Sequence, residues 1–356
     1  MEFIQHLPVS INLLLFLVAA IVTWVAGTKL AKTTDTLDTR WKIGDALGGL
    51  ILLGIAGSLP EIAVVASAAY YVHFPVIIGT LIGGIAIQTL LLVIFDFATG
   101  PKRPLSYLAG TVTMSVEMIF AIVITVLVLL GTFIPARITF LYANPMSWVL
   151  VVAWVVGLFV INKVRMQPKF NETEEDARPG RKHHHRRAVE NHVFYAGKST
   201  LYVGVIFLVF SLITLLAGWV LEESGVAIAT AFHIGDGLFA ATVLALATAL
   251  PEISTGLESI FIGDNQLAIS DIVGGNAFML VIFLLGDLVA RKSVLSTAGQ
   301  QDRVWAWLGI FMMAVYAVSF VKRLKQCYFR LGFDSILQIV LYAAGLVVLT
   351  YVVKSN

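Results

Sequence analysis

Charged residues and cysteines are scarce in this chain of 356 residues. Only 13% of its residues are charged, compared with about 25% in ordinary soluble domains. Hydrophobic residues make up 58%, and the mean hydropathy is +0.89. Apolar windows near the roughly 20 residues that cross a bilayer as a helix recur along the chain, so we predict an all-α integral membrane protein. The single cysteine, Cys327, excludes a disulfide within the chain and a multi-cysteine metal site.

Histidine is missing where a membrane enzyme would need it. None of the predicted spans carries a histidine near its centre, and the chain has no His-Glu-x-x-His pattern. These absences argue against a zinc metalloenzyme and against a Ser/His hydrolase within the bilayer. We therefore expect no enzymatic activity, no cofactor and no nucleic-acid partner.

What the chain does contain is a repeat. A shift of 191 positions, without a gap, places Leu59-Pro60-Glu61-Ile62 on Leu250-Pro251-Glu252-Ile253 and Ile43-Gly44-Asp45 on Ile234-Gly235-Asp236. The same shift places Gly83-Gly84 on Gly274-Gly275 and Asp96 on Asp287. A single register held from Ile43 to Asp96 indicates an internal duplication.

The apolar windows divide evenly between the two copies. The predicted spans cover residues 10–30, 43–71, 75–98, 105–130 and 146–162, then 199–221, 234–262, 266–290, 303–321 and 333–353. We predict ten transmembrane helices in two five-helix repeats, 1–164 and 199–356, joined by a cytoplasmic polar loop at 165–198. Because five is odd, the second copy enters the membrane from the opposite side, and the repeat is inverted. Pro60 and Pro251 predict that helices 2 and 7 are broken.

Basic residues set the expected orientation. If the N-terminus is outside, 19 of the 24 lysines and arginines fall on the cytoplasmic side, as the positive-inside rule requires. We therefore expect a multi-pass protein of the cell membrane, plasma or inner, with both termini outside and the central loop in the cytoplasm. Three adjacent histidines in that loop, His183, His184 and His185, could bind a transition metal. A solvated linker is the simpler interpretation, because alternating charge blocks do not fold alone.

Glu61 and Glu252 are the residues best suited to chemistry. Each falls in the middle of a predicted span, where an ionisable side chain usually marks an ion or proton path. Each follows a proline that removes a backbone donor, so carbonyls at 54–57 and 245–248 are expected to lose intrahelical partners and to point at a cation. Together with the hydroxyls of Ser58 and Thr248, these oxygens suit a hard cation that takes roughly six to eight oxygen ligands.

These motifs resemble those of the cation/calcium exchanger superfamily, in particular its sodium/calcium exchanger-like bacterial members. The family's repeats carry Gly-Thr-Ser-x-Pro-Glu and then Gly-Asn-x-x-Gly-Ser-Asn. The first repeat here reads Ala56-Gly57-Ser58-Leu59-Pro60-Glu61 and then Gly79-Thr80-Leu81-Ile82-Gly83-Gly84-Ile85. The second reads Ala247-Thr248-Ala249-Leu250-Pro251-Glu252 and then Ser270-Asp271-Ile272-Val273-Gly274-Gly275-Asn276. The resemblance covers essentially the whole chain and implies a ten-helix fold around one central cation site.

The resemblance also implies a ligand set, with the two glutamates binding calcium and flanking polar groups forming sodium sites. The candidate metal ligands are Glu61, Glu252, Ser58, Thr248, the backbone oxygens of Gly54 and Ala245, Gln88 and Asp271. Two of the family's serines are replaced by Gly84 and Gly275, and Met279 stands where the family places a polar or acidic residue. Several sodium ligands are thus missing from this chain.

We predict a secondary active antiporter that exports calcium in exchange for sodium through alternating access to Glu61 and Glu252. Its expected partners are inorganic cations and the lipid bilayer. Proton coupling stays open, because two carboxylates can hold two protons once the cation leaves. The sulfur of Met279 leaves a transition metal open, and a channel or a transport-altered scaffold is a further alternative. The sequence leaves the oligomeric state undetermined.

Other acidic residues have plainer interpretations. Asp45 and Asp236 begin the two broken helices, where the helix dipole stabilises a carboxylate, although both could also attract cations to the entrances. Asp96 and Asp287 end their helices, so we expect them to be exposed to solvent. Glu117 lies within the fourth span without a counterpart in the second copy, and the sequence does not identify its partner.

Overall fold

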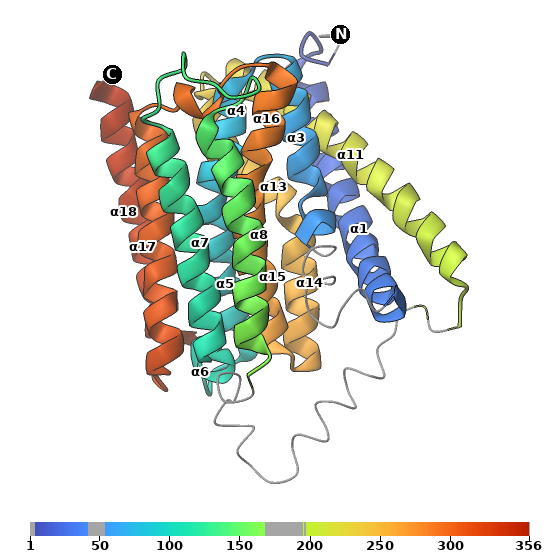
Figure 1. Cartoon of the computed structure of the whole chain (residues 1–356), viewed down its shortest axis with the longest axis vertical. Helices are drawn as coiled ribbons and strands as arrows, with labels where there is room; N and C mark the ends of the chain where they lie inside the picture. Colours follow the sequence, from blue (N-terminus) through green and yellow to red (C-terminus); the bar gives the residue numbers. More distant parts are fainter. Residues whose placement is uncertain (1–3, 42–53, 168–194, 196, 356) are drawn as a thin grey trace.

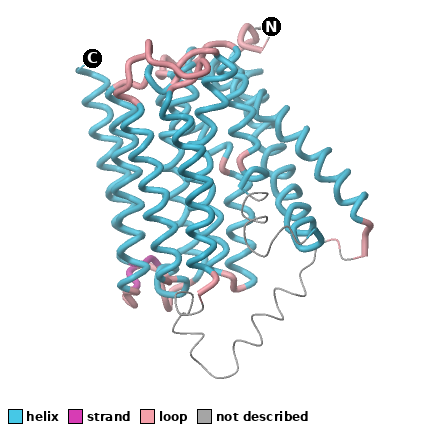
Figure 2. Tube along the Cα trace, viewed as in Figure 1, coloured by secondary structure: helices cyan, strands magenta, loops and turns pink. Residues whose placement is uncertain are grey.

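Long apolar helices account for most of the protein in the computed structural model, which describes residues 4–41, 54–167, 195 and 197–355 (Figure 1). The first half contains α1 (Val9–Trp41), α3 (Leu59–Tyr70), α4 (Phe74–Ile78), the π-helical turn η1 (Gly79–Gly83), α5 (Gly84–Thr99), α6 (Leu105–Ala109), α7 (Val112–Gly131) and α8 (Pro145–Arg165). Figure 2 shows that the loops lie mainly at the two ends of the bundle.

The second half follows the same plan. It contains α11 (Thr200–Ala231), α12 (Asp236–Phe239), the π-helical turn η2 (Ala240–Leu244), α13 (Ala245–Thr248), α14 (Leu250–Ile262), α15 (Asn265–Met279), the 3₁₀ turns η3 (Leu280–Ile282) and η4 (Leu295–Thr297), α16 (Phe283–Ala290), α17 (Gln300–Lys322) and α18 (Phe333–Ser355). A short antiparallel hairpin, β1 (Cys327–Tyr328) and β2 (Leu331–Gly332), pairs Cys327 with Gly332 before α18 begins.

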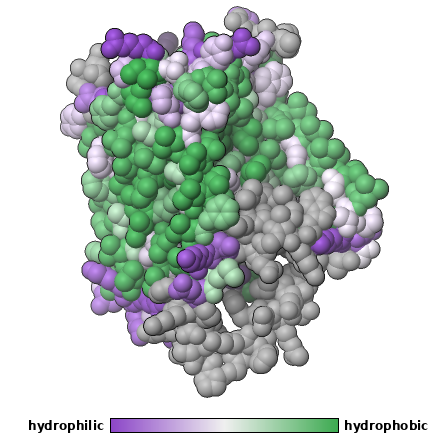
Figure 3. Space-filling model, viewed as in Figure 1, coloured by the Kyte–Doolittle hydropathy of each residue, from purple (hydrophilic) through white to green (hydrophobic). Residues whose placement is uncertain are grey.

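The all-α membrane fold is confirmed. Eight described helices are long and apolar enough to cross a membrane, and the pair Asp236–Thr248 and Leu250–Ile262, bent by 45°, makes a ninth. The second predicted span contributes the shorter apolar helix Leu59–Tyr70, and residues 42–53 of that span lie outside the described chain. The described part is therefore compatible with ten spans. A hydrophobic surface covers the middle of the visible face, with hydrophilic residues gathered toward both ends (Figure 3).

The backbone breaks at the same place in both copies. Before α3, Ser58 has φ −88° and ψ 12°; before α14, Ala249 has φ −83° and ψ 4°. These two residues are related by the 191-residue shift, and each stands two positions before the proline. Broken helices at the predicted positions follow from the missing proline N–H.

The first helix of each copy, α1 and α11, pack against each other on one side of the bundle (Figure 1). Both are longer than predicted, since α1 continues through the expected polar connection to Trp41 and α11 continues to Ala231. The extension of α11 carries Glu222 and Glu223, both buried, and their hydrogen bonds from Ser67 and Gln5 offset the cost of burying carboxylates.

The expectation that Asp96 and Asp287 are exposed is wrong, because both are buried. Asp96 accepts backbone N–H groups from Leu105 at 2.5 Å and from Gly332 at 2.7 Å. Asp287 accepts those of Val294 at 2.6 Å and Asn144 at 2.9 Å. Each carboxylate therefore accepts one N–H from the segment that follows its own helix and one from the other half of the chain. These charge-assisted hydrogen bonds outweigh the unfavourable interaction of a carboxylate with the C-terminal end of a helix dipole.

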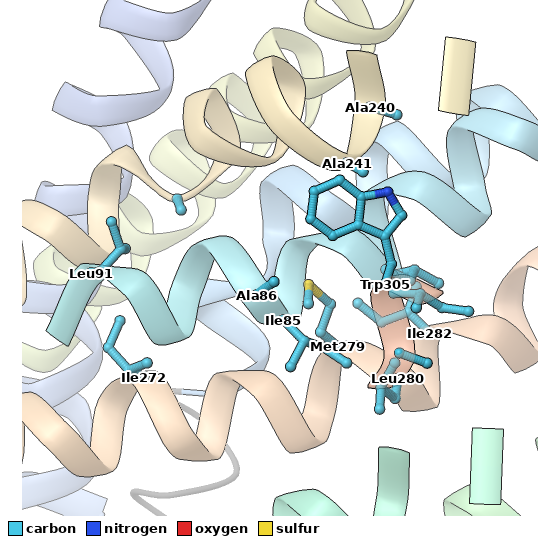
Figure 4. Packing of buried hydrophobic residues seen from close by; sticks show 14 of the residues in the cluster. Ile85, Ala86, Leu91, Ala240, Ala241, Ile272, Met279, Leu280, Ile282 and Trp305 are labelled. Carbon is cyan, nitrogen blue, oxygen red and sulfur yellow. The ribbon is translucent and has the colours of Figure 1, made fainter. Parts of the chain in front are cut away.

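The two copies meet closely at the centre, where η1 packs on η2. A Cβ at Gly83 would overlap the Cβ of Ala241, so the two turns can approach only because position 83 has no side chain. Around this crossing lie buried apolar side chains that include Ile85, Met279 and Trp305 (Figure 4). The candidate site lies beside this contact.

Candidate functional site

Glu61 and Glu252 occupy the first turns of α3 and α14, directly after the two breaks. Their exposed fractions are only 1% and 6%. Both oxygens of Glu61 and Oε2 of Glu252 have no hydrogen-bond donor among the described residues. A buried carboxylate without a donor is costly, so this arrangement requires a cation or a proton to be compensated.

The two glutamates reach across to the opposite copy. A Cβ added at Gly57 would lie 3.8 Å from Glu252 Oε1, with no other neighbouring atom within 4 Å. Glu61 faces the Thr248 hydroxyl and lies close enough to Glu252 for their charges to interact. The two carboxylates thus lie between the repeats, Glu252 near Gly57 and Glu61 near Thr248, and together they make the candidate site.

The carbonyls near the breaks differ in part from expectation. Gly54 O accepts the N–H of Ser58 at 3.2 Å, and Ala245 O accepts that of Ala249 at 3.1 Å. These two oxygens keep their intrahelical partners and have only a second lone pair left for a ligand. Pro60 and Pro251 have no N–H to donate to the carbonyl four residues earlier in the helix. The carbonyl oxygens that lose this donor are those of Ala56 and Ala247.

The other predicted ligands surround the glutamates unevenly. Ser58 and Thr248 are buried, and the Thr248 hydroxyl donates to Ala245 O at 3.1 Å. Asp271 is half-buried, accepts a hydrogen bond from Thr255 at 3.0 Å, and lies within electrostatic range of Glu252. Asp271 has no acidic counterpart in the first repeat, where Thr80 occupies the matching position.

Gln88 and Met279, the residues related by the shift, meet between the repeats. Gln88 Nε2 lies 3.9 Å from Met279 Sδ, and both side chains are buried. A Cβ at Gly84 would lie 3.3 Å from that sulfur, and one at Gly275 would lie 3.7 Å from Gln88 Oε1. The two glycines thus make room for the side chain of the opposite repeat, and Gln88 Oε1 remains without a donor in the described structure.

Gly27 and Gly218 make close contacts beside the candidate site that sequence reasoning missed. A Cβ at Gly27 on α1 would overlap the Pro251 ring, and one at Gly218 on α11 would lie 2.7 Å from the carbonyl oxygen of Pro60. The first helix of each copy therefore rests directly on the break of the other copy. The signal was available, since positions 27 and 218 are related by the same 191-residue shift.

This contact predicts a large difference between two glycines of one helix. Gly218→Ala should lower the unfolding temperature and reduce cation exchange, because the new methyl group pushes α11 away from α3 at a cost of about 1–3 kcal/mol. Gly204→Ala on the same helix should have neither effect, since nothing lies within 4 Å of a Cβ at that position. Thermal unfolding and vesicle flux of the two variants test this, and equal behaviour would contradict it.

Glu117 has a partner that the sequence did not identify. Arg165, the last residue of α8, donates through Nε to Glu117 Oε1 at 2.7 Å and through Nη2 to Ser270 Oγ at 3.0 Å. Ser270 in turn donates to Glu117 Oε2 at 2.9 Å. The network joins α7, α8 and α15, and it lines a pocket whose wall also includes Gly54 and Gly274. Glu117 is therefore a neutralised structural carboxylate beside the site.

A second polar cluster lies at the end of the bundle where the N-terminus is found (Figure 1). Glu222 on α11 receives the Ser67 hydroxyl at 2.7 Å and pairs with His73 Nδ1 at 2.8 Å. Its neighbour Glu223 receives Gln5 at 3.1 Å. The cluster ties α11 to the loop between α3 and α4.

Two aspartates were expected at the entrances of the broken helices. Asp236 begins α12, near this cluster, and is half-buried, whereas Asp45 lies outside the described residues. His183, His184 and His185 also lie outside the described residues.

His73 makes this tie dependent on pH. The hydrogen bond to Glu222 raises the pKa of His73 above its ordinary 6.5, with further support from the charges of Glu223 and Asp236 and against the effect of burial. Because the pKa is raised on folding, the stabilisation is fully present below about pH 6.5 and is lost as pH rises through the raised value. His73→Gln should therefore lower the unfolding temperature at pH 5.5 but not at pH 9.

The size of that effect is no more than about 1 kcal/mol, because the imidazole is partly exposed. The measurement is the unfolding temperature of the wild type minus that of His73→Gln across this pH range. The control is His233→Gln, because His233 is exposed and lies two residues after the end of α11. A difference that stays constant with pH would show that the His73 charge contributes nothing to the contact.

The described structure has two repeats with broken helices and a buried carboxylate at each break, an arrangement typical of inverted-repeat membrane transporters. The chain belongs to the sodium/calcium exchanger protein family, whose pattern it matches over residues 11–162 and 201–351. Members of this family are transporters rather than enzymes. The protein is therefore a multi-pass membrane antiporter of the cation/calcium exchanger type, as its motifs predicted.

Individual relatives agree with this family. The chain is 26% identical over 302 residues to CaxA of Alkalimonas amylolytica, whose name describes it as an antiporter; the match covers 80% of this chain and 84% of CaxA. It is 32% identical over 62 residues to the inner membrane protein YrbG of Escherichia coli K12, a match that covers 17% of this chain and 19% of YrbG.

Solved exchangers share the fold. The crystal structure of the H⁺/Ca²⁺ exchanger CAX aligns with a TM-score of 0.62 at 14% identity, covering 97% of this chain and 89% of that one. The sodium-calcium exchanger NCX_Mj aligns with a TM-score of 0.58 at 18% identity, covering 96% of this chain and 99% of that one. At these identities the likeness shows the fold alone.

Proposed function

We propose that this protein exports calcium in exchange for sodium through one central site built on Glu61 and Glu252. The observation that carries the proposal is the pair of buried carboxylates with three oxygens that lack a donor among the described residues. Two carboxylates balance the charge of one divalent cation, and calcium takes roughly six to eight oxygen ligands. The remaining oxygens come from Thr248, Ser58, Gln88 and the backbone around the breaks.

The cycle follows from the contact between the first helices and the breaks. When α1 and α11 shift together against the broken helices, the site is opened to one side of the membrane and closed to the other. Each repeat, residues 1–164 and 199–356, supplies one moving helix and one break in this scheme. Both termini are placed outside and the 165–198 loop in the cytoplasm of a cell-membrane protein, on the distribution of basic residues.

Proton coupling is the second candidate, and a specific observation favours it. Gly84 and Gly275 bring no side-chain oxygen to the site, and Met279 brings a sulfur in place of an oxygen. Fewer oxygens remain for several sodium ions, whereas Glu61 and Glu252 alone can accept two protons. In this version the carboxylates exchange one calcium ion for two protons.

Flux through purified protein in sealed vesicles tests both versions. Calcium uptake is measured with an outward sodium gradient at equal pH, and separately with an outward proton gradient without sodium. Uptake with the sodium gradient is the expected result. Uptake with the proton gradient alone would mean that protons, not sodium, are the counter-ion. No uptake under either gradient would overturn the proposed calcium antiport, and so would a calcium flux that needs no counter-ion.

A further inference from the structure

We infer that the hydroxyl groups of Thr23 on α1 and Thr214 on α11 are further ligands of the transported cation. They are supplied by the two helices that cover the site. The inference rests on the proposed function and adds residues that lie outside both Pro-Glu segments. Positions 23 and 214 are related by the 191-residue shift, so each repeat supplies one such hydroxyl.

Both threonines are buried with a hydroxyl group that makes no hydrogen bond within the described part of the chain. Each has an exposed fraction of 0%, and neither hydroxyl has a hydrogen-bond partner among the described residues. A buried hydroxyl without a partner costs on the order of 1–3 kcal/mol. A group outside the described chain, such as a bound ion that accepts the hydroxyl oxygen as a ligand, would recover that cost.

The other hydroxyls of these helices show that this state is not imposed by the helix itself. A helical serine or threonine normally satisfies its hydroxyl on a carbonyl of the preceding turn. On α1, Thr33 and Thr34 donate to Leu30 O at 2.8 and 2.9 Å. On α11, Ser211 donates to Phe207 O at 2.8 Å. Thr23 and Thr214 lack this bond, so their oxygens stay available.

The two threonines lie on the helix faces that pack against the broken helices. Thr23 stands one turn before Gly27, on the helix face that rests on Pro251 and packs on α13 and α14. Thr214 stands one turn before Gly218, on the face that rests on Pro60 and packs on α3. Each threonine therefore lies one turn from the glycine that contacts a broken helix, and the glutamate of that helix follows the contacted proline.

This placement gives the first helices a direct interaction with the cargo. The glutamates supply charge, and two neutral hydroxyl oxygens add to the ligand number that calcium requires. A cation held between the breaks then attracts α1 and α11 inward through these oxygens. An empty site leaves the hydroxyls without a partner, which weakens the hold of the two helices on the breaks.

Isosteric substitutions test the inference. Thr23→Val and Thr214→Val keep the shape of the side chain and remove only the hydroxyl. Without calcium, both variants should unfold at the wild-type temperature or slightly above it, because no satisfied bond is lost. The apparent calcium affinity should fall about tenfold, measured by the calcium-induced rise in unfolding temperature and by the calcium dependence of exchange. Thr23→Ser, which keeps the hydroxyl group, should keep most of the wild-type calcium affinity.

Thr33→Val is the matched control, since Thr33 is equally buried on α1 but bonds to its own helix. It should leave calcium affinity unchanged. The inference is overturned if the Thr23 and Thr214 variants keep wild-type affinity, or if they unfold at a lower temperature without calcium, which would make the hydroxyls structural. If the wild type neither transports calcium nor is stabilised by it, the proposed function fails and the inference fails with it.

Discussion

Glu61→Gln and Glu252→Gln should each reduce calcium exchange by roughly 100-fold, which corresponds to about 2.7 kcal/mol of lost stabilisation of the bound cation. Glutamine keeps the size of the side chain and one oxygen but removes the charge that balances the cation. Folding should not suffer, because both oxygens of Glu61 and Oε2 of Glu252 have no hydrogen-bond donor among the described residues. The substitutions therefore break no hydrogen bond to these three atoms. The unfolding temperature without calcium should even rise, since a neutral amide costs less to bury than a charge.

The opposite signs of these two effects separate a transport role from a structural one. Exchange is measured in vesicles and the unfolding temperature in calcium-free detergent solution. Glu258→Gln is the control on α14, the helix of Glu252: Glu258 is partly exposed and pairs with Lys32 at 2.9 Å, so its substitution should leave exchange within about twofold of wild type. Substantial exchange in either the Glu61 or the Glu252 variant would remove that residue from the transport site.

Arg165→Met should destabilise the protein by about 3–5 kcal/mol, the largest stability effect that we expect in this chain. The substitution leaves the Glu117 carboxylate buried, with an exposed fraction of 4%, and with only the Ser270 hydroxyl as a donor among the contacts described. Removing one partner of a buried pair costs more than the pair itself contributes, because the remaining charge is uncompensated.

A double substitution tests that reason directly. Glu117→Gln combined with Arg165→Met should recover much of the stability lost by Arg165→Met alone, since no buried charge remains. Lys163→Met, an exposed cation in the same last turn of α8, should change stability by less than about 0.5 kcal/mol. The three unfolding temperatures in detergent decide the question. A double variant as unstable as Arg165→Met would mean that the arginine acts through packing instead of charge.

Most of the fold could be predicted from the sequence because its signals are local or periodic. Apolar windows predicted the spans, and one 191-residue register predicted the duplication and both broken helices. The proline effect on the backbone depends only on a missing N–H, so the break at Ala249 was predictable without neighbours. The family followed from the same motifs and is confirmed.

Predictions failed where the partner of a side chain comes from a distant part of the chain. Asp96 was expected in solvent because its own helix end repels it, yet Gly332, far along the sequence, supplies the N–H that holds it inside. Glu117 had no recognisable partner until α8 placed Arg165 beside it. Such contacts leave no periodicity in the sequence.

The sequence by itself therefore determined the membrane class, the inverted duplication and the family, and it led to Glu61 and Glu252 as the proposed site. Only the tertiary structure decided how the repeats meet: Gln88 and Met279 lie against the glycines of the opposite repeat, and Gly27 and Gly218 lie against the opposite prolines. The physical reason is that helix formation and membrane insertion depend on neighbouring residues, whereas burial and hydrogen bonding in a cation site depend on which helices meet in space.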